Sequence, residues 1–158
     1  MLRKILVPID GSEHARSALN MALELARIHG SEVEILHVTS FSEEYTPTES
    51  EEARAPMREE SLSPSEWMSE YMAKVREDKE KMLGQALRDA EAMYPNLRIT
   101  SKLLLGRPGG TIVSEAMEGG FDLVVIGSRG LGGLAKLVLG SVSQRVVNES
   151  KVPVLVVK

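Results

Sequence analysis

Cysteine is absent from the sequence, and this absence excludes several kinds of chemistry. Disulfide frameworks, zinc-finger sites, CxxC redox centres and cysteine nucleophiles all require that residue. Aromatic residues are also scarce, at 4% of the chain, and none lies between Gly127 and Gly140. A flavin carrier that holds its ring between aromatic side chains is therefore not expected.

The chain also lacks a surplus of positive charge and a long apolar run. Its formal net charge is −4, with 19 Lys and Arg against 23 Asp and Glu. Nucleic-acid-binding proteins present a cationic face to phosphate, so this balance opposes such a role. No apolar stretch approaches the roughly 18 residues of a membrane-spanning helix. We expect a cytoplasmic protein that contacts neither nucleic acid nor membrane.

The length fits one domain that covers residues 1–158. A chain of this size buries about 68–70% of the surface that its unfolded form exposes, so it needs no disulfide or metal for stability. Hydrophobic residues make up 42% and charged residues 27%, values typical of a globular domain.

The spacing of apolar residues predicts strands that alternate with helices. Nearly continuous apolar runs predict strands at residues 4–9, 32–39, 98–105, 121–126 and 152–157. Helical spacing predicts helices at residues 12–28, from 65 to the Pro95-Asn96 stop, at 111–118 and at about 142–150. Residues 106–110, rich in glycine, are expected to form a turn. This alternation predicts an α/β fold, an open parallel five-stranded sheet with helices on both faces.

One segment breaks this alternation. Residues 41–64 contain three prolines and are rich in glutamate, which is typical of a solvated loop. We expect an acidic, proline-containing insert at about residues 41–64 within the single domain.

The most informative segment follows the predicted fourth strand. It has Gly127 and Gly130, then nine residues, then Gly140-Ser141 at the entrance to the last helix. Glycine lets the backbone approach a ligand closely, and a helix N-terminus offers unpaired N–H groups with partial positive charge. Because ligands of open α/β sheets bind beyond the carboxyl ends of the strands, this pattern favours a phosphate site.

Structural explanations compete with this hypothesis. A glycine-rich segment can be only a loop, and a serine before a helix can be only its cap. Asp10 and Glu13 have the spacing of a capping box, so Asp10 can cap the first helix, bind a ligand, or do both. The three histidines show no metal-ligand or nucleophile spacing, so neither a metal site nor a catalytic residue is predicted.

The glycine pattern resembles the ATP-binding signature of the universal stress protein family. The resemblance extends to residues 7–12, to Leu36-His37-Val38 and to residues 152–157, and it covers nearly the whole chain except the insert. It implies a Rossmann-like sheet, similar to the adenine nucleotide alpha hydrolases, with strand order 3-2-1-4-5. It also implies a homodimer through the last strand, Val152 to Val157.

The resemblance carries nucleotide-binding positions onto this sequence. Asp10 is similar to the family's aspartate near the ribose, and Val38 matches the position whose backbone meets adenine. The complete set of implied nucleotide-binding residues is Pro8, Ile9, Asp10, Ser12, Val38, Ile126, Gly127, Ser128, Arg129, Gly130, Gly140, Ser141, Val142 and Ser143. Gly130 and residues 140–143 match the phosphate cradle, Ile126 and Gly127 the sugar, and Ser128 and Arg129 lie in the same loop.

The implied function is that of an ATP-binding regulatory module in a stress response. The chain lacks GxxxxGK[ST], so it has no P-loop lysine, and fast hydrolysis is not expected. ATP, or ADP or AMP, is the implied ligand, with Mg²⁺ or Mn²⁺ carried by the phosphates. Two alternatives stay open, a slow ATPase in the same pocket and a nucleotide-free dimeric scaffold that acts on an unknown protein partner.

Overall fold

A computed structural model describes residues 1–40, 64–130 and 139–158 of the chain. Its five strands are β1 (Lys4–Pro8), β2 (Glu32–Thr39), β3 (Ile99–Leu105), β4 (Leu123–Gly127) and β5 (Val154–Val157). All neighbouring strands pair in parallel, in the order β3-β2-β1-β4-β5. The predicted fold class and strand order are confirmed.

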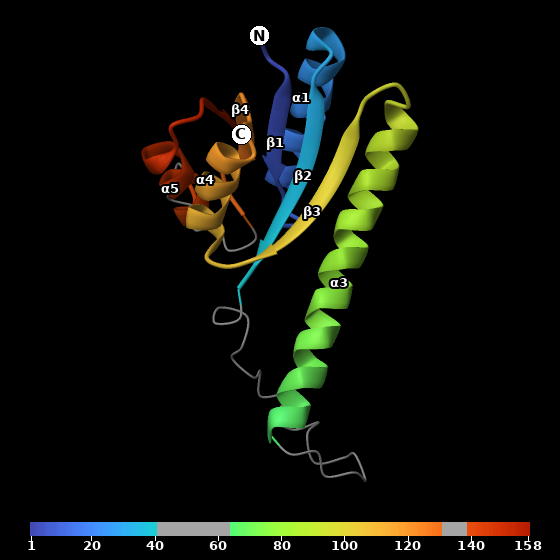
Figure 1. The fold of residues 1–158 in the computed structure, drawn as a ribbon, viewed down its shortest axis with the longest axis vertical. Coiled ribbons are helices and arrows are strands. Elements are labelled where there is room, and N and C mark those ends of the chain that lie inside the picture. The colour runs from blue at the N-terminus through green and yellow to red at the C-terminus, as the bar shows by residue number, and fades with distance from the viewer. Residues whose placement is uncertain (41–63, 131–138) are drawn as a thin grey trace.

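Helices cover both faces of the sheet (Figure 1). They are α1 (Glu13–His29), α3 (Pro64–Met93), α4 (Pro108–Glu118) and α5 (Ser141–Glu149). Successive side chains of β1 point to opposite faces. Ile5 and Val7 belong to the buried cluster with α1 and α3, whereas Leu6 belongs to the cluster with α4 and α5. The apolar runs of the central strands therefore fill two separate cores.

Helix α1 begins and ends with the residues that helix chemistry favours. The hydroxyl oxygen of Ser12 accepts a hydrogen bond from the N–H of Ala15 and caps the first turn. Gly30 ends the helix in the left-handed conformation, at φ 69°, and its N–H bonds the carbonyl of Ala26. The predicted start and end of this helix are each within about a residue of the observed ones.

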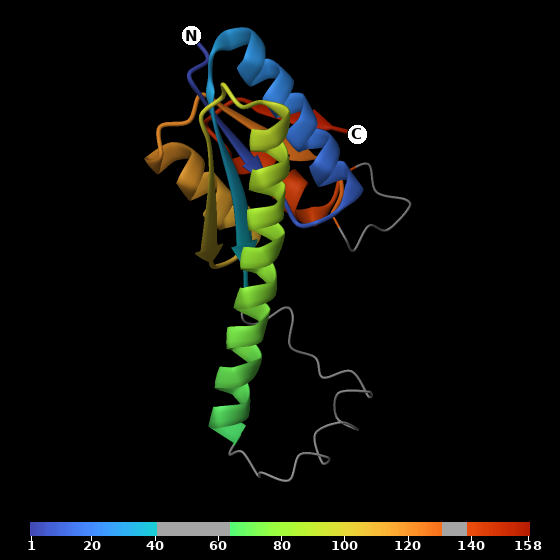
Figure 2. The ribbon, with the colours of Figure 1, turned by 90° about the vertical axis from the view of Figure 1, so that its right-hand side faces the viewer.

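Helix α3 is much longer than the strands that it packs against. Its C-terminal half packs through Leu83 and Ala90 against the same core as α1. Its N-terminal half extends past the carboxyl ends of the strands, as the two views show (Figures 1 and 2). The acidic insert predicted at residues 41–64 lies outside the described residues except for Pro64, with which α3 begins.

Several predicted boundaries are wrong by a few residues. Helix α4 begins at Pro108, inside the segment expected to be a turn, because proline at the first helical position loses no hydrogen bond. Strand β4 begins at Leu123 rather than at residue 121, and the Asp122 carboxylate just before it accepts the N–H groups of Arg3 and Lys4 at 2.7 and 2.9 Å. Strand β5 begins at Val154 and helix α5 spans residues 141–149.

Within the described ranges, none of the helices combines the length and the apolar character that crossing a membrane would require.

Candidate functional site

Most of the predicted site residues lie along the carboxyl edge of the sheet. Pro8 ends β1, Ile126 lies in β4 one residue before that strand ends, and Val38 is the penultimate residue of β2. Asp10 and Ser12 follow β1, and Ser128, Arg129 and Gly130 follow β4. The parallel topology thus gathers segments that are more than a hundred residues apart in the sequence.

Asp10 links the loop after β1 to the loop after β4. One carboxylate oxygen accepts the N–H of Ser12 at 2.9 Å. The other lies where a side chain at position 130 would begin, because a Cβ atom built on Gly130 would be 2.5 Å from Asp10 Oδ2. The absence of a side chain at Gly130 therefore allows Asp10 its position. Ser12, rather than Asp10, is the N-cap of α1, so the capping-box interpretation of Asp10 is wrong.

Gly127 brings the end of β4 against the first turn of α1. A Cβ atom at this position would lie 2.7 Å from the carbonyl carbon of His14, a distance that backbone atoms cannot accommodate. This glycine is required for packing between a strand and a helix, a role that the sequence analysis did not assign to it. Ser128 follows, with its N–H bonded to the carbonyl of Val157 at 2.7 Å and its hydroxyl 3.4 Å from His14 Nδ1.

The N-terminus of α5 lies against the same loop. The N–H of Gly140 donates to the carbonyl of Ser128 at 2.8 Å. Gly140 is the N-cap of α5, and a glycine has no side chain with which to cap the helix. The first-turn N–H groups of an α-helix have no partner within the helix, so those of α5 are available to an anion. Among the described residues, a Cβ atom on Gly140 would meet its nearest neighbour at 3.6 Å, so their packing does not require glycine here.

Ser143 has a different immediate role from the predicted one. Its hydroxyl donates to the carbonyl of Gly127 at 2.7 Å, and the side chain is buried. The hydroxyl proton therefore ties α5 to the end of β4 in this structure. A contact between Ser143 and a nucleotide remains a prediction, and its backbone N–H is the group best placed for one.

Electrostatics favour an anion between these elements. Helices α1 and α5 both begin at this edge, and each N-terminus carries a partial positive charge. The segment from Gly127 to Gly130 contacts both, through His14 of α1 and Gly140 of α5. Arg129 lies in the middle of that segment and adds a full positive charge. Residues 131–138, which are eight of the nine residues in the spacer, lie outside the described residues.

His37 fixes the end of β2 to the site, a connection that sequence reasoning missed. Its Nδ1–H donates to the carbonyl of Ile9 at 2.7 Å, and the ring is buried. The N–H of Ile9 in turn donates to the carbonyl of Leu36 at 2.8 Å. The sequence analysis assigned no role to this histidine, and only the three-dimensional pairing of the two strands shows its partner.

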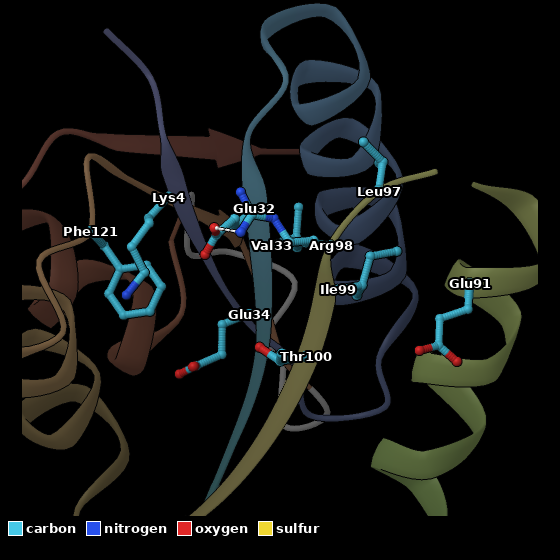
Figure 3. Close-up of a pocket in the computed structure, with 10 residues that line it drawn as sticks. All are labelled: Lys4, Glu32, Val33, Glu34, Glu91, Leu97, Arg98, Ile99, Thr100 and Phe121. Atoms are coloured by element: carbon cyan, nitrogen blue, oxygen red, sulfur yellow. Dashed lines mark ion pairs between the residues drawn. The ribbon is translucent and has the colours of Figure 1, made fainter. Parts of the chain in front are cut away.

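A hollow of about 430 Å³ lies at the opposite, amino-terminal edge of the sheet (Figure 3). Its lining includes Glu34, Phe121 and the ion pair between Arg98 and Glu32, whose atoms are 2.8 Å apart. The backbone of β2 and β3 divides it, since Val33 and Ile99 belong to the core under α3 whereas Glu34 lies near Glu115 of α4. It is far in the fold from the glycine loop and is not the candidate nucleotide site.

No dedicated metal centre accompanies the site among the residues that the structure describes. They contain no group of three or more His, Asp or Glu side chains that could hold an ion. A divalent cation at this edge would therefore take most of its ligands from phosphate oxygens and water.

Comparison with known proteins gives a consistent result. The model of the universal stress protein family matches residues 1–158. The universal stress protein YxiE of Bacillus subtilis is 34% identical over 158 residues, and the match covers 100% of both chains. A universal stress protein of Thermus aquaticus is 35% identical over 158 residues, again with 100% of both chains covered.

Solved structures share the fold. The protein MJ0577 of Methanocaldococcus jannaschii superposes with a TM-score of 0.78 at 28% identity, over 100% of this chain and 96% of that one. A universal stress protein in complex with cAMP has a TM-score of 0.65 at 24% identity, over 99% and 97% of the two chains. A third, from Archaeoglobus fulgidus in complex with dAMP, has a TM-score of 0.61 at 19% identity, over 100% and 98%. The likeness to these last two concerns the fold alone.

Proposed function

The chain belongs to the universal stress protein family, and from this premise we propose that it binds ATP at the carboxyl edge of its sheet and acts as a nucleotide-dependent regulatory switch in a stress response. One observation carries the proposal. The segment from Gly127 to Gly130 lies between the N-terminal ends of α1 and α5, and the N-cap of α5 is a glycine, which has no capping side chain. Backbone N–H groups and two helix dipoles therefore converge where the phosphates would lie.

Each predicted residue has a role in this proposal. The phosphates lie on Gly130, Gly140 and the first turn of α5, next to Arg129. The ribose lies against Asp10, whose carboxylate is oriented by the N–H of Ser12. The base lies at Val38, on the strand end that His37 fixes to Ile9. Pro8 and Ile9 lie beside Asp10, Ile126 and Gly127 flank the sugar at the end of β4, and Ser128 lies in the same loop as Arg129.

Mg²⁺ or Mn²⁺ enters this proposal with the nucleotide. The ion would be held by the phosphates and would neutralise part of their charge, which lowers the repulsion between ATP and the acidic chain. The switch requires only that ATP bind one arrangement of the protein better than another, so turnover is not needed. The cytoplasmic location and the single domain of residues 1–158 remain predictions.

Isothermal titration calorimetry tests the binding step. We expect saturable binding of ATP with Mg²⁺, one nucleotide per chain, and mass spectrometry of ligand released from freshly purified protein should identify an adenine nucleotide. Parallel titrations with ADP and AMP measure how much of the affinity the terminal phosphates contribute. Absence of binding to all three nucleotides, together with no copurified ligand, would refute the proposal and favour the scaffold.

Hydrogen exchange with and without ATP tests the switch separately. Protection confined to the ligand-contacting loops would leave binding in place but remove the switch. Protection that extends to an element outside the site, such as the N-terminal half of α3, would support it.

A further inference from the structure

The hydroxyl group of Thr39 has no role in the proposed function as stated so far. Thr39 is the last residue of β2, and the residue as a whole is 8% exposed. Its hydroxyl oxygen is buried and has no hydrogen-bond partner among the residues that the structure describes. The backbone of Thr39 is satisfied, since its carbonyl accepts the N–H of Gly106 at 2.9 Å.

A buried hydroxyl without a partner is unfavourable for the folded protein. Valine has nearly the same shape as threonine, is also β-branched and suits a strand end, and it would fill this position without the cost of a desolvated oxygen. Packing and strand propensity therefore do not account for threonine at position 39. Buried polar groups of this kind need another explanation, and a ligand that supplies the missing partner is one.

The position of Thr39 indicates which part of a ligand it would meet. It follows Val38, where the base of the nucleotide is proposed to lie. It is two residues from His37, which fixes this strand end to Ile9 in the loop that carries Asp10. A base at Val38 that belongs to a ribose at Asp10 must therefore lie beside the end of β2.

We infer that the hydroxyl of Thr39 hydrogen-bonds the base of the bound nucleotide and thereby contributes to base recognition; this inference rests on the proposed function. A hydroxyl both donates and accepts, so it can accept from the exocyclic amine of adenine or donate to a ring nitrogen. Rotation about χ1 exchanges the positions of the hydroxyl and the methyl group, so the oxygen can turn toward a base that arrives beside it.

The test compares three variants with the wild-type chain. Thr39→Val removes the hydroxyl and keeps the shape. Thr39→Ser keeps the hydroxyl and removes a methyl group. Thr100→Val makes the same chemical change on β3, at an exposed position at the far end of the sheet, and serves as the matched control.

We expect Thr39→Val to weaken ATP, ADP and AMP by the same factor of about five to ten, the effect of one neutral hydrogen bond. Binding of inorganic tripolyphosphate, which has no base, should stay at the wild-type value. Without nucleotide, Thr39→Val should melt about 2–4 °C higher than the wild type because the unpartnered hydroxyl is gone. Thr39→Ser should bind ATP within about twofold of wild type, and Thr100→Val should match wild type in affinity and melting.

Three results would overturn the inference. Wild-type affinity in Thr39→Val would show that the hydroxyl does not contact the base. An equal loss of tripolyphosphate affinity would show a general disturbance of the site. A lower melting temperature in Thr39→Val alone would show that the hydroxyl has a partner within the folded chain. The wild-type titration with ATP is judged by itself, and its failure would refute the proposed function together with this inference.

Discussion

At the scale of single residues, glycines at the site differ in what they do. Gly127 allows β4 to touch α1, Gly130 leaves room for the Asp10 carboxylate, and Gly140 has no described atom closer than 3.6 Å to its Cβ position. Of these three glycines, Gly140 is therefore the one that packing among the described residues does not require, and its substitution reports most directly on a ligand.

Gly140→Val should abolish ATP binding and leave the fold intact. The backbone of Gly140 has φ −71° and ψ 161°, values that valine adopts readily, and its Cβ would meet no atom of the described residues closer than 3.6 Å. The rest of the side chain would occupy the space in front of the α5 N-terminus, where the phosphates are proposed to lie. We expect a loss of affinity of at least about a hundredfold in calorimetry and a loss of stability of about 1 kcal/mol, since valine is a poor N-cap.

Circular dichroism and thermal melting serve as the control for that variant. A folded Gly140→Val protein that binds ATP with wild-type affinity would remove the phosphate cradle from the proposal. Gly130→Ala tests the same site in a second way, because the alanine Cβ would displace Asp10 Oδ2. Its effect on affinity should be largely lost in an Asp10→Asn background if the two residues act as one unit.

Glu34 provides a prediction that does not depend on a ligand. Burial raises the pKa of its carboxyl, and the nearby Glu115 carboxylate raises it further, while Lys102 and Lys4 act in the opposite direction. One oxygen of Glu34 is buried and has no hydrogen-bond partner in the described part of the chain. The ionised carboxylate is therefore less stable in the folded protein than in the unfolded one.

Glu34→Gln should stabilise the protein at neutral pH. A raised folded-state pKa means that the folded state is favoured when Glu34 is protonated, and this contribution is lost as the pH rises through that value. Glutamine resembles the protonated form, so the gain should be present at pH 7 to 8 and vanish as the pH falls to about 4, near the pKa of an unfolded glutamate. Each unit of pKa difference corresponds to about 1.4 kcal/mol.

Urea denaturation at several pH values measures this effect. Glu32→Gln on the same strand is the matched control, because Glu32 pairs with Arg98 at a more exposed position and its loss should cost at most about 1 kcal/mol at neutral pH. A Glu34→Gln gain that is equal at pH 4 and pH 8 would contradict the pKa explanation.

The sequence was sufficient to choose most of the residues that the fold brings to this edge, but it did not give their partners. Asp10 and Gly130 were each chosen for a ligand, and their contact with one another depends on how the first and fourth strands pair. The same holds for His37 and Ile9, and for Ser143 and Gly127. Spacing along a chain identifies residue types, whereas these contacts arise from strand order.

At the scale of elements, periodicity predicted the type and order of every helix and strand in the described ranges. It failed at termini where a tertiary contact decides the boundary. Gly109 reads as a turn residue in the sequence, but it lies in the first turn of α4, where a Cβ atom would come within 2.8 Å of Arg145 Cδ. The glycines before Thr111 thus allow α4 to pack on α5, which local propensity does not reveal.

Glycine within α3 allows a test of helix propensity against packing. Gly84 lies in the interior of this helix, and a Cβ atom there would meet only the flexible guanidinium of Arg88, at 3.2 Å. Gly84→Ala should therefore raise the free energy of unfolding by about 0.5–1 kcal/mol, because alanine loses less backbone entropy on folding. Chemical denaturation measures the change.

Gly30→Ala is the counterpart with the opposite sign. No atom lies within 4 Å of a Cβ at Gly30, but the residue has φ 69°, which strains any side chain. It should destabilise the protein by about 1 kcal/mol, even though its side chain would fit. If the two substitutions changed the free energy of unfolding by the same amount, the space available to the added Cβ, rather than backbone conformation and entropy, would determine their effects.

At the scale of the whole molecule, the topology explains why one edge of the sheet carries the proposed function. Strands on either side of β1 are reached by crossovers on opposite faces, so α1 and α5 begin at the same edge but belong to different layers. The loops after β1 and β4 diverge there. Ligands of open α/β sheets bind between loops that diverge in this way. The strand order, which the family resemblance implied, therefore also indicates the edge at which the proposed site would lie.

The same topology leaves β5 at an outer edge of the sheet, paired only with β4 in the described chain. An apolar edge strand invites pairing with another chain unless charge, proline or a covering element blocks it. Leu155 is among the exposed large hydrophobic residues, and no charged residue lies in Val154–Val157. A homodimer in which two β5 strands pair about a twofold axis would cover both edges at once.

Sedimentation at micromolar concentration should accordingly show a dimer, and Leu155→Lys should shift it to a monomer. Val147→Lys is the matched control, since Val147 of α5 is similarly exposed, at 40% against 36% for Leu155, but lies away from the strand edge. It should remain dimeric. The Leu155→Lys monomer should still bind ATP, because every residue assigned to the nucleotide belongs to one chain. A wild-type monomer would refute the dimer, and loss of ATP binding in a folded Leu155→Lys monomer would mean that the partner chain completes the site.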